Sequence, residues 1–391
     1  MMLLSISCVA QIDDLQRDYF RAQNYMLHNQ TDSAIMLWKQ HSDVIEFAEC
    51  LTDYFIDNEQ YSKALPCCRD LEKINSAEAD FRFARIYAGM GFAEESVAYL
   101  EKHFAGNNNR TYTEILRCSE FENINRTAEW REFWNTPRYS KLEEMFADIE
   151  YQISSGKYDY AIEMLDEMSF AKPARRNYLY AKAHRGLENY GQAEKYINLA
   201  MQSNSKDAKI LSLCTEIQKN AGKYSDAYET CKRLLSADRY NAEVLLDFAD
   251  ICVFNKKNAE AKIYTGRYLQ CFPDNEKALF MDAKLAVSAD YSYEALVELS
   301  KLIELNSSNS EYFKMRGEAY YGFEMWNQAF YDFSMALDIT PDDASLNYLM
   351  GMCKYNMASY EKACYYWRRA ATGKSREAAE MYYKYCEAIE N

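Results

Sequence analysis

An alanine recurs at a nearly constant interval between residues 161 and 363 of this 391-residue chain. The successive intervals are 32, 34, 34, 34, 34 and 34 residues, at Ala161, Ala193, Ala227, Ala261, Ala295, Ala329 and Ala363. A fixed period of this length predicts stacked helical hairpins, because each repeat is one helix pair that buries its apolar face against the next. Arrays of this kind bind partners rather than carry out reactions, so the period also indicates a class of function.

The clearest repeat unit is residues 310–343. Small residues stand where two helices would cross closely, and aromatic residues stand beside them, where the gaps are wider. A proline closes the unit, since proline cannot continue a helix. These positions are Gly317, Tyr320, Trp326, Ala329, Phe333, Ala336 and Pro341. At each of them the unit resembles the consensus of the tetratricopeptide repeat (TPR) family.

The resemblance implies an all-α fold, a right-handed TPR-type α-solenoid of about ten or eleven helical hairpins with a C-terminal capping helix. The regular array covers residues 142–377, and residues 11–106 are divergent repeats of the same type. Residues 107–141 are a degenerate repeat or hinge, because a Gly-Asn-Asn-Asn run at 106–109 breaks the helical pattern. Residues 378–391 are expected to form the polar-faced cap that a solenoid needs for solubility.

The first ten residues are uncharged and mostly apolar, and they end in Cys8, Val9 and Ala10, as a signal peptide does near its cleavage site. The basic start of a signal peptide is missing and the apolar run is short, so two interpretations stay open. The favoured one is a truncated signal peptide, with export to the bacterial periplasm or cell envelope. The alternative is an apolar arm on a cytoplasmic protein. No other stretch of the sequence is long and apolar enough to span a membrane.

Charge and cysteine content narrow the classes of partner. The 45 basic and 60 acidic residues leave a net charge of −15, which opposes binding to nucleic acid. The 12 cysteines include no C-x-x-C pair and no metal-ligand spacing, so we expect no metal. Several fall inside expected helices, where cysteine serves as a small apolar residue. These are Cys214, Cys231, Cys252, Cys353 and Cys364.

Signatures of catalysis are missing from the sequence. The four histidines lie in different repeats without an H-x-x-x-H pair. The one close glycine pair, Gly89 and Gly91, lacks the strand and the third glycine of a phosphate-binding loop. Because repeats occupy nearly all of the chain, we expect a non-catalytic scaffold with no cofactor. The same scaffold as a cytoplasmic regulatory adaptor is the alternative, and an enzyme is the least favoured interpretation.

The TPR resemblance also implies where a partner binds, since the first helix of each repeat lines the inner groove in that family. One surface expected there is basic with a single aromatic residue, at Arg175, Tyr178, Lys182, Arg185 and Lys209. A second is aromatic, at Phe280, Tyr321, Tyr348 and Tyr355, and a third is acidic, at Glu46, Glu49, Asp53 and Asp57.

The basic surface is the main candidate. Its first four residues recur at intervals of three and four, so they share one helix face. In a chain of net charge −15, such a face attracts an acidic segment of a partner protein. No repeat carries the Lys–Asn pair with which chaperone-binding TPR domains clamp a C-terminal carboxylate. The plainer alternative is that these charged side chains only keep a helix face solvated.

Overall fold

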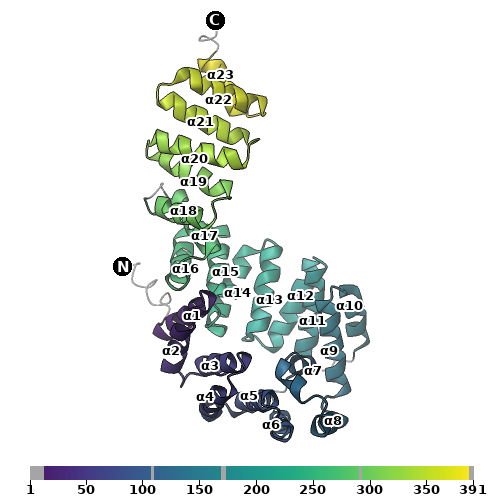
Figure 1. The fold of residues 1–391 in the computed structure, drawn as a ribbon. Helices are drawn as coiled ribbons and strands as arrows, with labels where there is room; N and C mark the ends of the chain where they lie inside the picture. The colour runs from purple at the N-terminus through teal and green to yellow at the C-terminus, as the bar shows by residue number, and fades with distance from the viewer. Residues whose placement is uncertain (1–12, 107–109, 169–172, 290–292, 387–391) are drawn as a thin grey trace, which may run out of the picture. The chain divides into compact units, whose positions relative to one another are not determined.

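The computed structural model describes residues 13–106, 110–168, 173–289 and 293–386 (Figure 1). These ranges contain 23 α-helices, one short 3₁₀ helix and no strand. The signal-like residues 1–10 and the end of the expected cap, residues 387–391, lie outside the described residues. Within the described ranges no helix is long and apolar enough to cross a membrane. The chain divides into two compact units, residues 1–244 and 245–391.

Consecutive helices of the first unit pair as hairpins. The pairs are α1 (Asp14–Leu27) with α2 (Thr31–Gln40), α3 (Ile45–Asp57) with α4 (Tyr61–Ile74), α5 (Ser76–Gly89) with α6 (Ala93–Ala105), α9 (Lys141–Ser154) with α10 (Tyr158–Glu167), α11 (Pro173–Gly186) with α12 (Tyr190–Ser203), and α13 (Ala208–Asn220) with α14 (Tyr224–Ala237). The regular pairing is interrupted between α6 and α9. That stretch holds α7 (Tyr112–Leu116), the 3₁₀ helix η1 (Ser119–Asn123) and α8 (Ala128–Asn135).

The second unit continues the same hairpin pattern. Its pairs are α15 (Glu243–Phe254), which begins at the boundary, with α16 (Asn258–Cys271), α17 (Glu276–Ser288) with α18 (Tyr293–Leu305), α19 (Ser310–Gly322) with α20 (Trp326–Ile339), and α21 (Ala344–Asn356) with α22 (Tyr360–Thr372). A last helix, α23 (Arg376–Tyr385), packs on α22 where the capping helix is expected. The boundary between the units falls inside the range 142–377, which the repeat pattern alone leaves continuous.

The recurring alanines mark the points where the two helices of a hairpin approach most closely. All seven are fully buried, with 0% of their surface exposed. Glycine allows an even closer approach in the last regular repeats. A Cβ atom added to Gly317 would lie 2.6 Å from the ring of Phe333, and one added to Gly351 would lie 2.4 Å from the ring of Trp367. The all-α TPR-type solenoid expected from the 34-residue period is therefore confirmed.

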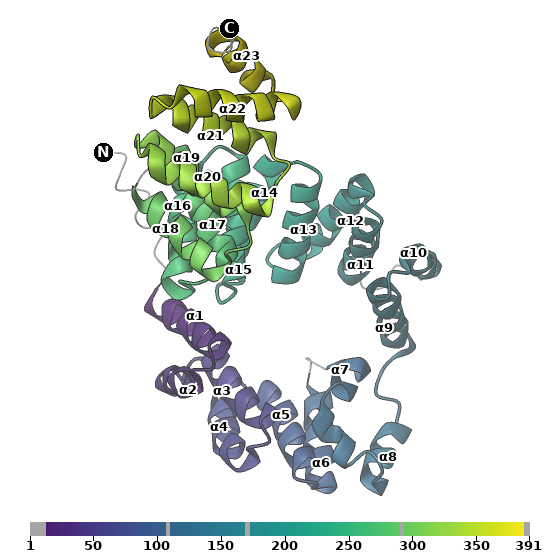
Figure 2. The same cartoon turned by 45° about the horizontal axis from the view of Figure 1, so that its top comes forward.

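The start of the first unit is covered by residues that follow its last hairpin. The Tyr240 ring lies 4.9 Å from the ring of Tyr19 on α1 and 6.2 Å from that of Phe47 on α3, between centroids. The side-chain amide of Gln16 donates a hydrogen bond of 2.6 Å to the Arg239 carbonyl oxygen. Figure 2 shows the hairpins of the first unit following a curve from α1 round to α14. The first unit therefore closes on itself.

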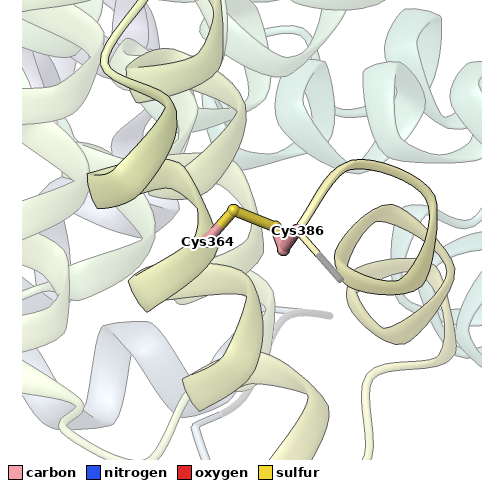
Figure 3. The surroundings of a disulfide bond; sticks show 2 residues. All are labelled: Cys364 and Cys386. Carbon is pink, nitrogen blue, oxygen red and sulfur yellow. A yellow bond between two sulfur atoms is a disulfide. The ribbon is translucent and has the colours of Figure 1, made fainter. Parts of the chain in front are cut away.

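One cysteine differs from its expected role. Cys364 is bonded to Cys386, with an S–S distance of 2.05 Å, so the expectation of a free apolar side chain there was wrong (Figure 3). The bridge ties the end of α23 to α22. The error arose because the two cysteines are 22 residues apart and meet only after the chain reverses between these helices. The other cysteines expected in helices, Cys214, Cys231, Cys252 and Cys353, are buried thiols.

Candidate partner-binding groove

Helix α11 presents most of the basic surface. It begins at Pro173, a residue that suits the first helical position because the missing N–H would have no partner there. Tyr178, Lys182 and Arg185 line one hollow of about 520 Å³, together with Lys209 from α13. We call this space the basic hollow. The structure therefore brings four of the five residues of the expected basic surface together.

Arg175 lies in a neighbouring space. It lines a larger hollow of about 1110 Å³, which we call the large hollow and which also includes Lys209. The Arg175 guanidinium bonds to the carboxylates of Glu143 and Glu150 on α9, the latter at 3.0 Å, and lies 4.6 Å from the centroid of the Phe146 ring. Its charge is thus neutralised inside the first unit and is not offered to a partner.

The remaining cations of the basic surface fall into two groups. Arg185 forms an ion pair with Glu216 of α13. Lys182 and Lys209 form no side-chain ion pair or hydrogen bond with any described residue of the chain. Lys182 is half-buried and Lys209 is exposed, so both ammonium groups remain available for an anionic ligand.

Tyr178 forms an apolar wall of the basic hollow and carries a hydroxyl donor. Burial, and then the negative charges of Glu150 and Asp207, raise the pKa of its phenol. The hydroxyl therefore stays protonated near neutral pH and can donate a hydrogen bond. A carboxylate in this hollow would meet two ammonium groups and one phenol, and the two carboxylates that also line it, Glu216 and Asp238, are held by Arg185 and Asn241.

The large hollow is built mostly from the stretch that the sequence marks as a degenerate repeat. Its aromatic lining comes from Tyr112, Trp134, Tyr139 and Tyr151, on α7, α8, the loop after α8, and α9. The Trp134 and Tyr112 rings meet edge to face at 4.9 Å, and the Tyr139 hydroxyl donates a 2.7 Å hydrogen bond to the Arg110 carbonyl. The repeat pattern of the sequence indicates no site here. The aromatic run at 130–134 is the signal that could have indicated one.

The acidic surface expected on α3 is neutralised by two arginines of α5. Arg82 bonds to Asp53 at 2.7 Å and to Glu49 at 3.4 Å, and Arg85 bonds to Asp53 at 3.1 Å and to Asp57 at 2.7 Å. Burial opposes the charge of Arg85, but its carboxylate partners raise the pKa of the guanidinium, so it remains charged. These three carboxylates are therefore internal ion-pair partners and do not form an open acidic surface.

The aromatic surface of the second unit is engaged in packing between neighbouring helices. The ring centroid of Phe280 lies 5.1 Å from that of Tyr312, and the Tyr321 ring lies 4.7 Å from the Trp326 ring. Tyr348 and Tyr355 pack on the cluster around Trp367, at the end of the array. These four aromatic residues belong to the second unit and line neither hollow.

Comparisons with known proteins return similarities to solved structures only. No family model matches the chain, and no curated protein matches it. A crystal structure of MamA protein is 17% identical over 44% of this chain and 94% of its own, with a TM-score of 0.41. YrrB, described as a TPR protein with an unusual peptide-binding site, is 20% identical over 49% of this chain and 100% of its own, with a TM-score of 0.44. MamA from Desulfovibrio magneticus RS-1 is 14% identical over 43% of this chain and 94% of its own, with a TM-score of 0.42.

Proposed function

Because the chain is a solenoid of TPR-type hairpins, we propose that it is a non-catalytic scaffold that binds an extended segment of another protein in the groove lined by α11 and α13. One observation carries the proposal. In the basic hollow, Lys182 and Lys209 have no ion pair among the described residues, whereas the adjacent Arg185 is paired with Glu216. Two unpaired ammonium groups beside a phenol favour the binding of an acidic segment. Because the net charge of the chain is −15, the rest of its surface repels such a segment, which directs it to this hollow.

The test uses a fluorescein-labelled, end-capped peptide rich in glutamate. In the double variant Lys182→Gln with Lys209→Gln, we expect the dissociation constant measured by fluorescence anisotropy to rise several-fold. Binding to the parent chain should weaken as salt is added, since the screening length falls to about 3 Å at 1 M.

The matched control removes two other lysines from the same two hairpins. Lys195→Gln with Lys232→Gln changes one exposed lysine on each second helix, α12 and α14, outside both hollows. Its net charge equals that of the test variant, so only the position of the lost charge differs. Equal peptide affinity in the two double variants would contradict the proposal.

The proposed location is the periplasm or cell envelope of a bacterium. The Cys364–Cys386 bridge supports it, because disulfides persist in oxidising compartments and are rare in the cytosol. Six of the other described cysteines are buried thiols, which are compatible with that setting. Burial raises the pKa of Cys214 to about 11 and that of Cys353 to about 12, which keeps them as unreactive thiols.

Thiol labelling in intact cells tests this location. Cells are quenched with acid, thiols are alkylated, and peptides that carry Cys364 and Cys386 are analysed by mass spectrometry. We expect both cysteines to escape alkylation until a reductant is added. Complete alkylation without a reductant would instead support the cytoplasmic alternative.

A further inference from the structure

The charged side chains that line the two hollows are mostly paired with one another or with near neighbours. Arg110 bonds to Glu78, Arg175 to Glu143 and Glu150, Arg138 to Glu101, and Arg185 to Glu216, while the Glu114 and Asp238 carboxylates accept hydrogen bonds from Thr111 and Asn241. Four charged lining residues have no side-chain ion pair or hydrogen bond within the described ranges. They are Glu144 and Asp148 in the large hollow, Lys182 in the basic hollow, and Lys209 in both.

The two unpaired carboxylates lie on one face of α9 beside an exposed aromatic ring. Glu144, Asp148 and Tyr151 follow at intervals of four and three, which places them in a row along the helix. The Tyr151 side chain is 63% exposed, and that of Tyr112, on another wall of the hollow, is 47% exposed. Carboxylates next to accessible aromatic faces suit a lysine or arginine side chain, which gains ion pairing and cation–π contact together.

The two hollows adjoin at Lys209, which lines both. A segment that leaves the carboxylates of α9 therefore passes Lys209 before it reaches Lys182 on α11. The unpaired charges change sign along this path, from acidic at α9 to basic at α11 and α13.

We propose that the two hollows bind consecutive parts of one extended protein segment, with a lysine or arginine in the large hollow and an aspartate or glutamate in the basic hollow. The inference rests on the proposed function of the basic hollow and adds a second subsite and a direction. Direction follows because a segment bound the other way round would place like charges together in both hollows.

Three synthetic peptides of one composition, and a fourth that contains no lysine, test this arrangement. Two carry a lysine block and a glutamate block joined by two glycines, one with lysines first and the other with glutamates first. A third alternates lysine and glutamate, and a fourth carries glutamate alone. We expect one of the two block peptides to bind the parent chain several-fold more tightly than the reversed, the alternating and the glutamate-only peptides, by fluorescence anisotropy at low salt.

Variants of α9 identify the second subsite. Glu144→Gln with Asp148→Asn should remove the advantage of the favoured block peptide and leave the affinity for the glutamate-only peptide at least as high. Both residues are exposed, so the helical content measured by circular dichroism should not change. The control is Glu163→Gln with Glu167→Gln, two exposed glutamates with the same spacing on α10 of the same hairpin. The control should bind all four peptides as the parent does.

The outcomes separate this inference from the proposed function. Block peptides that bind no better than glutamate alone would overturn the second subsite and leave the basic hollow standing. An advantage of the favoured block peptide that persists in Glu144→Gln with Asp148→Asn would also overturn the second subsite and leave the basic hollow standing. A glutamate-only peptide whose affinity is unaffected by Lys182→Gln with Lys209→Gln would overturn both.

Discussion

Ion pairing between neighbouring helices decides which charges of the groove a partner can use. Arg175 and Lys182 lie on the same face of α11, yet only Arg175 meets carboxylates, those of Glu143 and Glu150 on α9. Partly exposed pairs of this kind stabilise a protein by only about 0–1 kcal/mol each. Their main effect here is on recognition. They remove the Arg175 charge from the binding surface and leave the ammonium group of Lys182 available to a ligand.

A pair of carboxyl groups in the second unit makes stability depend on pH. The Glu298 carboxyl of α18 hydrogen-bonds to Asp282 of α17, which is 5% exposed. Burial, then this hydrogen bond and the charge of Asp282, raise the pKa of Glu298 to about 8. Two adjacent carboxyl groups cannot both ionise at low cost, so Glu298 keeps its proton to a higher pH than an exposed glutamate does.

The sign of the pH effect follows from proton binding. Between the ordinary glutamate pKa of about 4.3 and the raised value, the native state holds a proton that the unfolded chain has lost. The free energy of unfolding of the second unit should therefore decrease as pH rises from about 5 to about 8. Glu298→Gln keeps a neutral side chain at all pH values. Above about pH 8 we expect it to exceed the parent in stability by on the order of 1 kcal/mol, after allowance for solvent screening.

Urea unfolding followed by circular dichroism at several pH values measures this difference. The control is Glu294→Gln, which changes an exposed carboxylate that pairs with Lys262 in the same cluster. The control should keep the pH slope of the parent. Parallel pH profiles for the parent and Glu298→Gln would show that the proton on Glu298 does not contribute.

At the scale of helices, the sequence predicts the regular elements well and their exceptions poorly. Spacing of small and aromatic residues defines the hairpins, because close crossing depends on residues such as Ala329 and Phe333 that recur in each repeat. The aromatic run at 130–134 falls in the short helix α8. The large hollow and the bridge to Cys386 were not predicted, because both depend on which helices meet after folding. The ion pairs of Arg175 with Glu143 and Glu150 were not predicted for the same reason.

Helix α23 is held to the array by its covalent bridge and by partly buried side chains such as Met381 and Tyr382. Ala378 is its one buried residue within Arg376–Tyr385, and the Tyr385 ring adds a contact of 4.9 Å with the Tyr355 ring, between centroids. A bridge that closes a loop of this length adds roughly 3 kcal/mol by restricting the unfolded chain. Cys364→Ser with Cys386→Ser should therefore speed amide hydrogen exchange in α23 by a factor of ten or more, at roughly 1.4 kcal/mol for each factor of ten.

Helix α13 provides the internal reference for this measurement, since it belongs to the first unit. Its amide exchange should be the same in the parent and the double serine variant. Treatment of the parent chain with a reductant should reproduce the effect of the substitutions on α23. Unchanged exchange in α23 would mean that packing alone holds the helix.

At the scale of the whole molecule, the two units protect their terminal helices differently. A solenoid exposes an apolar face at each end, and this must be covered for solubility. In the second unit the covering element is α23, joined to α22 by the disulfide. In the first unit the covering residues are Arg239 and Tyr240, which follow α14 and contact α1. The contact joins residues more than two hundred positions apart in the chain, so repeat spacing gives no indication of it.

The closing contact of the first unit should stabilise α1. Tyr240 packs against Tyr19 and Phe47, and each aromatic pair of this kind adds about 0.5–1.5 kcal/mol beyond burial. Tyr240→Ala should therefore increase amide hydrogen exchange in α1 roughly five- to tenfold, while α11 exchanges as in the parent. Tyr160→Ala is the control, because Tyr160 on α10 is 52% exposed and lies far along the chain from α1. If α1 exchanges equally in both variants, the aromatic contact does not hold the unit closed. If only Tyr240→Ala loosens α1, peptide binding measured on the same variant will show whether closure also shapes the groove.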